Sequence, residues 1–94
     1  MSDITTTTVT SDGVAVNHPA RVKSIYFIRG ASAGLIVLKD GGASGTTLLT
    51  LTTPGAGSGV DAANTVAIPS DGLRFSTNVY VDVTNVSSVV LFHA

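Results

Sequence analysis

Hydrophobic and polar residues alternate along much of the chain, in short stretches separated by Gly, Pro, Asn and Asp. The segment 79–84 shows this best, because every second residue of its sequence VYVDVT is valine. A period of two residues places successive side chains on opposite faces of a β-strand. Every stretch of ten residues also holds a Gly, a Pro or a cluster of Val, Ile or Thr, so no helix is predicted.

Turn residues divide the chain into strands. Asp-Gly pairs beginning at Asp12, Asp40 and Asp71 predict turns, because Asp hydrogen-bonds to the turn backbone and Gly tolerates a positive φ. The Gly-rich segment 55–64 is expected to be a surface loop. The expected extended segments are 4–10, 14–17, 21–29, 35–39, 46–53, 65–68, 73–76, 79–84 and 88–92. This pattern predicts an all-β fold, a compact antiparallel β-sandwich or jelly-roll-like domain of seven to nine short strands.

The N-terminal residues differ from the rest by their run of four threonines, Thr5 to Thr8. We expect residues 1–12 to form an extended arm and residues 13–94 a single β-sandwich domain. Such an arm adds a strand to the sheet edge of a neighbouring subunit, with Ile4, Thr6 and Thr8 as contacts. The alternative is a frayed terminus.

The segment 20–30 carries most of the positive charge. Its even positions hold no charged residue, which indicates a core face. Its odd positions are Arg21, Lys23, Ile25, Phe27 and Arg29. These five residues are the candidate contacts with an acidic partner, in which a charged rim surrounds two apolar anchors. The alternative is a solvated face on which the basic side chains cover the two apolar groups.

The composition indicates an assembly subunit. The chain has 94 residues, of which 44% are hydrophobic and 12% are charged. A domain of this size buries only about 60–65% of its surface, so some apolar surface must contact lipid or protein. The longest apolar runs, 35–38 and 89–92, are far shorter than the ~18 residues of a membrane helix. We therefore expect no membrane partner, and an oligomer in which strands 35–38, 48–51 and 89–92 make subunit contacts.

The residues needed for catalysis are missing. The chain has no Cys and only two histidines, His18 and His93, with no nucleophile motif and no spacing typical of metal ligands. The Gly-rich segment 41–45 lacks the Lys-Ser/Thr of a phosphate-binding loop. We expect no catalytic residue, cofactor, metal or small-molecule substrate. The net charge of −1 also argues against nucleic acid as a partner.

Two segments resemble a known group of proteins. The C-terminal segment 71–92 and the strand–turn–strand segment 33–49, with its Asp40-Gly41 turn, are similar to small virion structural proteins of tailed phages that infect cyanobacteria and marine bacteria. The resemblance covers residues 20–94 and lies in the pattern of strands and turns. It implies a protein without an active site at a decoration (cement), neck or tail position.

These observations lead to one main expectation. The protein is expected to be a capsid decoration protein, a homotrimer that bridges and stabilises copies of the major capsid protein or other virion proteins. It would reside in the virion, which assembles in the cytoplasm of the bacterial host. One alternative is a neck, tail or fibre-associated subunit. Another is a glycan-binding module, which requires exposed aromatic platforms.

Overall fold

The computed structural model describes residues 4–57, 59 and 62–94. Within these residues the chain forms nine β-strands and no helix, so the predicted all-β class is confirmed. The strands are β1 (Thr5–Val9), β2 (Gly13–Val16), β3 (Ala20–Arg29), β4 (Gly34–Asp40), β5 (Thr46–Thr53), β6 (Ala63–Ala67), β7 (Leu73–Phe75), β8 (Val79–Thr84) and β9 (Val86–His93). Strands β5 and β8 have the predicted bounds. The predicted loop 55–64 ends early because β6 begins at Ala63, and residues 58, 60 and 61 of that loop lie outside the described residues.

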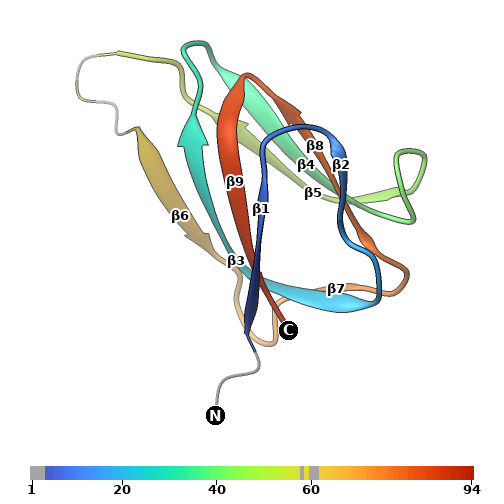
Figure 1. The fold of residues 1–94 in the computed structure, drawn as a ribbon. Helices are drawn as coiled ribbons and strands as arrows, with labels where there is room; N and C mark the ends of the chain where they lie inside the picture. The colour runs from blue at the N-terminus through green and yellow to red at the C-terminus, as the bar shows by residue number, and fades with distance from the viewer. Residues whose placement is uncertain (1–3, 58, 60–61) are drawn as a thin grey trace.

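The strands form a β-sandwich of two antiparallel sheets (Figure 1). The first sheet has the order β1-β9-β3-β6, and β7 pairs with the beginning of β3. The second sheet has the order β2-β8-β4-β5. The molecule measures 39 × 33 × 19 Å. Its smallest dimension fits two sheets packed about 10 Å apart, together with their outward side chains.

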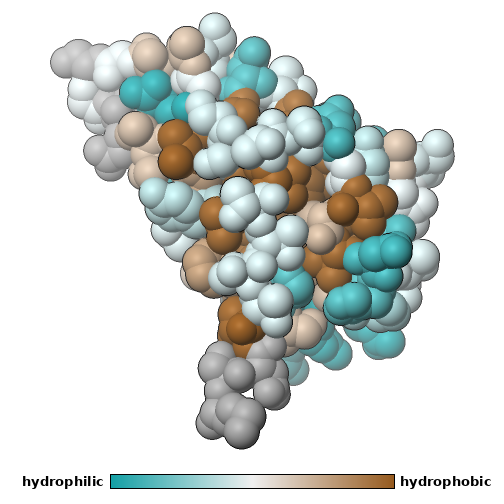
Figure 2. All heavy atoms as spheres, viewed as in Figure 1, coloured by the Kyte–Doolittle hydropathy of each residue, from teal (hydrophilic) through white to brown (hydrophobic). Residues whose placement is uncertain are grey.

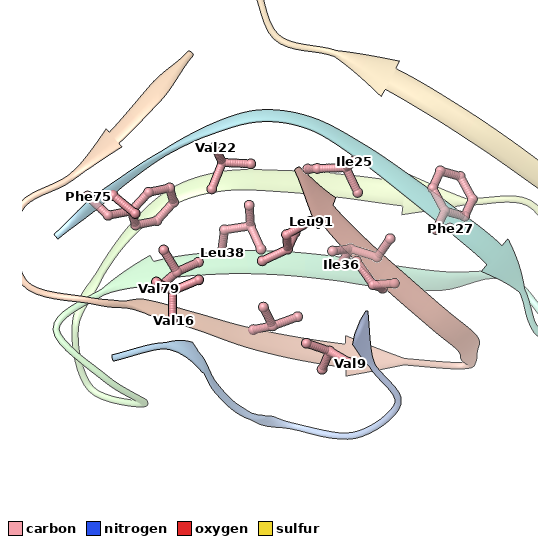
Figure 3. Packing of buried hydrophobic residues seen from close by; sticks show 13 residues of the cluster. Val9, Val16, Val22, Ile25, Phe27, Ile36, Leu38, Phe75, Val79 and Leu91 are labelled. Carbon is pink, nitrogen blue, oxygen red and sulfur yellow. The ribbon is translucent and has the colours of Figure 1, made fainter. Parts of the chain in front are cut away.

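One hydrophobic core fills the space between the sheets. Figure 3 shows Val22, Ile25 and Phe27 of β3 on one side of the core and Ile36 and Leu38 of β4 on the other. Each fully buried side chain of this kind contributes about 1.5–3 kcal/mol relative to an exposed one. The buried hydrophobic residues are Val9, Val16, Ala20, Val22, Ile25, Phe27, Ile36, Leu38, Phe75, Val79, Val81, Val89 and Leu91.

The N-terminal segment belongs to this sandwich. β1 pairs with β9 in a continuous register from Thr5↔His93 to Val9↔Val89, and Val9 is buried in the core. For residues 4–12 this differs from the expected arm over residues 1–12 and from the expected domain boundary at residue 13, and residues 1–3 lie outside the described residues. The physical reason is that β9 would otherwise have an open edge, and the backbone of β1 satisfies the hydrogen-bonding groups of that edge.

β3 departs from strict alternation at one point. Val22 pairs with His93 and Ser24 pairs with Phe92, so Lys23 is an extra residue in β3. Such a β-bulge shifts the alternation of all later side chains by one position. The core face of β3 therefore changes from even to odd residue numbers at the bulge.

Two of the expected Asp-Gly turns have the backbone that glycine favours. Gly41 and Gly72 have φ angles of 103° and 87°, which lie in the left-handed region. A side chain at Gly72 would also lie 2.5 Å from the carbonyl oxygen of Val22. The turn before β7 therefore packs closely against β3.

Candidate interaction surfaces

The predicted contact patch on β3 is wrong for Ile25 and Phe27. These side chains are only 0% and 5% exposed and lie in the core (Figure 3). The bulge at Lys23 is the cause, because it turns the odd positions after it inward. Arg29, at the far end of β3, is half-buried, and its Nη1 donates a hydrogen bond to the Gly30 carbonyl at 3.3 Å. The structure therefore does not bring the five predicted residues onto one face.

A different set of residues forms the outer face of the first sheet. Its large side chains are Tyr26, Ile28, Val90 and Phe92, which lie on the adjacent central strands β3 and β9. We call this surface the uncharged face. It consists of Thr6, Thr8, Ser24, Tyr26, Ile28, Ala63, Thr65, Ala67, Ser88, Val90 and Phe92. Figure 2, viewed as in Figure 1, shows mainly pale and brown atoms in the middle of the molecule, with most of the strongly hydrophilic atoms toward its margins.

The predicted N-terminal contacts fall partly on this face. Thr6 and Thr8 are exposed and lie next to Phe92 and Val90, respectively. Ile4 precedes β1 and is 41% exposed. The outward face of an antiparallel sheet normally carries polar and charged residues. The absence of charge from the uncharged face is therefore unusual for a face in contact with water alone.

Positive charge gathers at one end of the same sheet. Arg21 of β3 and Arg74 of β7 are exposed and directly opposite each other. They line a shallow hollow of about 540 Å³. The Lys23 side chain passes beside Gly72, in the turn that also contains Asp71. We call Arg21, Lys23 and Arg74 the basic end. Like charges on opposing strands repel each other, so the two guanidinium groups do not neutralise one another.

Sequence reasoning missed Arg74, because only the pairing of β7 with β3 brings it beside Arg21. The local pattern of residues along the chain gives no information about a neighbour on a distant strand. The sequence did indicate the apolar outward residues of strand 89–92, of which Val90 and Phe92 lie on the uncharged face. The role of that strand in subunit contacts stays a prediction.

The outer face of the second sheet has a mixed character. Val14, Leu35 and Leu48 are 48%, 38% and 36% exposed. They share this face with Lys39 and Asp82, which carry opposite charges on neighbouring strands β4 and β8. This face therefore has exposed apolar residues but lacks the uniformly neutral surface of the first sheet.

The two tyrosines are too far apart in the fold to serve together as an aromatic platform. Tyr26 lies on the outer face of the first sheet, and Tyr80 lies opposite Lys39 and Val14 on the outer face of the second. Tyr26 and Tyr80, the two tyrosines of the sequence, therefore lie on opposite sides of the sandwich.

The carboxylate of Asp40 connects two loops. It accepts hydrogen bonds from the backbone N–H of Ser76 at 3.0 Å, of Thr77 at 2.9 Å and of Asn78 at 3.4 Å. The Ser76 hydroxyl donates another at 2.8 Å. These bonds, first that of the Ser76 N–H, hold the pKa of Asp40 below its usual value of 3.8.

A second set of bonds runs in the opposite direction. The Asn78 Oδ1 atom accepts hydrogen bonds from the N–H groups of Gly41 and Gly42, both at 3.1 Å. The turn after β4 and the turn before β8 are thus joined by reciprocal bonds. Sequence reasoning gave Asp40 only a role in its own turn, because its partners are more than 30 residues away.

The two histidines have different surroundings. His93 is buried, and its Nε2 atom lies 2.9 Å from the Thr7 hydroxyl oxygen. Burial lowers the pKa of His93, and repulsion from His18 lowers it further. His18 is exposed, and its Nδ1 donates to the Pro19 carbonyl at 2.8 Å. In residues 4–57, 59 and 62–94, no group of three or more His or Asp side chains is arranged to hold a metal ion.

In the same described ranges, the structure has no helix that is long and apolar enough to cross a membrane. The comparisons with known proteins give no relative. No protein-family model matches the chain, and neither a curated protein nor a solved structure matches it.

Proposed function

We propose that this protein is a non-enzymatic structural subunit of a phage virion, a capsid decoration protein that bridges neighbouring capsid subunits. One observation carries the proposal. The uncharged face is bordered at one end by Arg21, Lys23 and Arg74, so a neutral surface with large apolar side chains at its centre is combined with a charged rim. That combination is typical of the centre and edge of protein interfaces.

The uncharged face supplies the binding energy. Burying apolar surface is worth ~25 cal/mol per Å², and large side chains at the centre of an interface contribute most of it. Tyr26, Ile28, Val90 and Phe92 occupy that central position. Threonine and serine side chains around them add no charge that would have to be desolvated.

The basic end supplies orientation. A partner with acidic residues opposite Arg21 and Arg74 binds in one register, since any other register leaves the two guanidinium groups without counter-charges. Each bridge contributes a modest free energy. Many copies on one particle add their contributions, and the particle then withstands heat and internal pressure better.

The resemblance of residues 20–94 to virion proteins of tailed phages supports a location in the particle. It is equally compatible with a neck, tail or fibre-associated position. The copy number of the protein in purified particles separates these two positions, since a decoration protein covers the whole capsid and the alternative occupies one vertex or the tail.

The test uses particles that lack the protein and are incubated with purified variants. Wild-type protein is expected to bind and to raise the temperature at which DNA is released. Ile28→Asp places a charge on the uncharged face and is expected to abolish both effects. Leu35→Asp is the matched control, because Leu35 is 38% exposed and Ile28 is 37% exposed, on opposite faces of the sandwich.

Leu35→Asp is expected to behave like wild type. Equal binding by both variants would rule out the uncharged face as the docking surface. Absence of the protein from purified particles would rule out the virion role as a whole.

A further inference from the structure

β5 has features that distinguish it from the other edge strands. It lies at the end of the second sheet and pairs on one side only, with β4. It has eight residues, whereas the edge strands β1, β2, β6 and β7 have five, four, five and three. Its sequence TTLLTLTT contains no charge and no proline. Charges, proline, short length and β-bulges are the usual devices that protect an edge from pairing with another chain, and of these β5 has only a bulge.

The leucines of β5 are also incompletely covered. Leu48 is 36% exposed on the outer face, and Leu49 and Leu51 are only partly buried where they pack against the core. A bulge at Leu48 interrupts the pairing with β4, after which the register is regular from Leu49↔Leu38 to Thr53↔Gly34. The stretch 49–53 is therefore a regularly paired edge whose outward backbone groups have no partner strand in the described part of the second sheet and whose two leucines are partly exposed.

We propose that two copies of this chain pair through β5 in an antiparallel, two-fold arrangement that joins their second sheets into one continuous sheet. The occupant of the edge is a second copy because the strand is compatible with itself. A two-fold axis near the middle of the strand places the central residues next to their own copies and each end opposite the other end, so a charge near the centre of β5 would be repelled by its copy. An uncharged strand of threonine and leucine meets no such repulsion, and pairing covers Leu49 and Leu51 from the side.

This interface is separate from the uncharged face, so the proposal goes beyond the proposed function and stands without it. An edge-to-edge contact is small, and interfaces at the low end of the size range are weak and concentration-dependent. We therefore expect a reversible dimer.

The test measures the mass of the purified chain by sedimentation over a wide concentration range. Wild type is expected to shift from monomer to dimer as concentration rises. Thr50→Lys and, separately, Leu48→Lys place a charge on the edge strand and are expected to weaken the dimer about tenfold or more. Thr84→Lys is the matched control, because Thr84 is exposed on the same face of the same sheet but on the internal strand β8.

Hydrogen exchange locates the contact. Amides in 46–53 are expected to gain protection as wild-type concentration rises, and Thr50→Lys is expected to remove that gain. The proposal is overturned if wild type stays monomeric, if it forms a trimer, if Thr84→Lys weakens association as much as Thr50→Lys, or if protection rises elsewhere. Ile28→Asp is expected to leave this dimer intact, so loss of capsid binding and loss of the dimer are separate results.

Discussion

Asp40 shows how one partly exposed residue can organise this sandwich. Its carboxylate accepts bonds from residues 76–78, and Asn78 returns bonds to the turn that follows Asp40. Charged acceptors form stronger hydrogen bonds than neutral ones. The pair therefore fixes the distance between the β4–β5 hairpin of the second sheet and the β7–β8 turn, in which the chain crosses from the first sheet to the second.

We predict that Asp40→Asn lowers the melting temperature, because the amide keeps one acceptor but loses the charge. Asp40 has a lowered pKa in the folded protein, so its contribution is present above pH 3.8 and is lost as the pH falls through the folded value. The stability difference between wild type and Asp40→Asn is therefore expected to shrink in acid. Asp82→Asn is the control, and an equal effect of both substitutions would contradict the role of the Asp40 bonds.

Thr53 differs from Asp40 because its polar side-chain group is buried and neither accepts nor donates a hydrogen bond within the described part of the chain. Its side chain is 3% exposed, and its hydroxyl has no hydrogen-bond partner among the described residues. A buried hydroxyl without a partner is costly. We predict that the isosteric Thr53→Val stabilises the protein by about 1 kcal/mol in denaturant unfolding. Thr52→Val, at an exposed neighbour, is expected to have little effect, and a destabilised Thr53→Val would show that the hydroxyl is satisfied.

His93 makes the contact between β1 and β9 sensitive to pH. Because its pKa is lowered by burial, the folded protein favours the neutral ring, and stability falls as the pH drops from 6.5 through the folded value. We predict that NMR titration gives His93 a pKa below 6.5. His93→Gln is expected to reduce the loss of stability in that range. A similar reduction in His18→Gln would contradict burial as the main cause.

At the scale of elements, the bulge in β3 decides which of its residues lie on the outer face of the first sheet. Before Lys23 the even positions face the core, and after it the odd positions do. One extra residue in one strand therefore exchanges Ile25 and Phe27 for Tyr26 and Ile28 on the outer face.

This exchange is tested by one substitution at two positions of the same strand. Ile25→Ala is expected to cost about 2–5 kcal/mol of unfolding free energy, because Ile25 is fully buried. Ile28→Ala is expected to cost at most about 1 kcal/mol, because Ile28 is 37% exposed. Chemical denaturation of both variants provides the measurement, and the reverse order would mean that β3 alternates without a bulge.

At the scale of the whole molecule, two surfaces of different chemistry support the two proposals. The uncharged face ends in the arginine pair Arg21 and Arg74, whereas β5 has no charge at all. Salt acts on these surfaces differently, since it screens charge but does not weaken apolar contacts.

We predict that NaCl separates the two interactions. Raising it from 0.1 M to 1 M shortens the screening length from ~10 Å to ~3 Å and is expected to weaken binding to capsids. Dimerisation through β5 is expected to stay the same or to increase slightly. Sedimentation and particle binding measured at both salt concentrations provide the comparison. A dimer that dissociates at 1 M NaCl would be held by charged groups. Such a result would contradict an interface formed by β5, which has no charged residue.

Local chemistry explains how much of the fold the sequence predicts. The strands at 46–53 and 79–84 and the turns at Gly41 and Gly72 follow from alternation and from residues that favour turns. These preferences act over a few residues, so they can be recognised in the chain itself. The strand content and the sandwich class followed from them.

Pairing between distant segments decided the rest. The bulge at Lys23, the position of Arg74 beside Arg21, and the pairing of β1 with β9 each depend on which strands become neighbours. A shift of one residue in register moves every later side chain of the strand to the other face of the sheet. No local sequence pattern indicates that shift. The sequence by itself thus determined a sparsely charged, β-rich chain with excess apolar surface, and only the tertiary structure decided which residues form that surface.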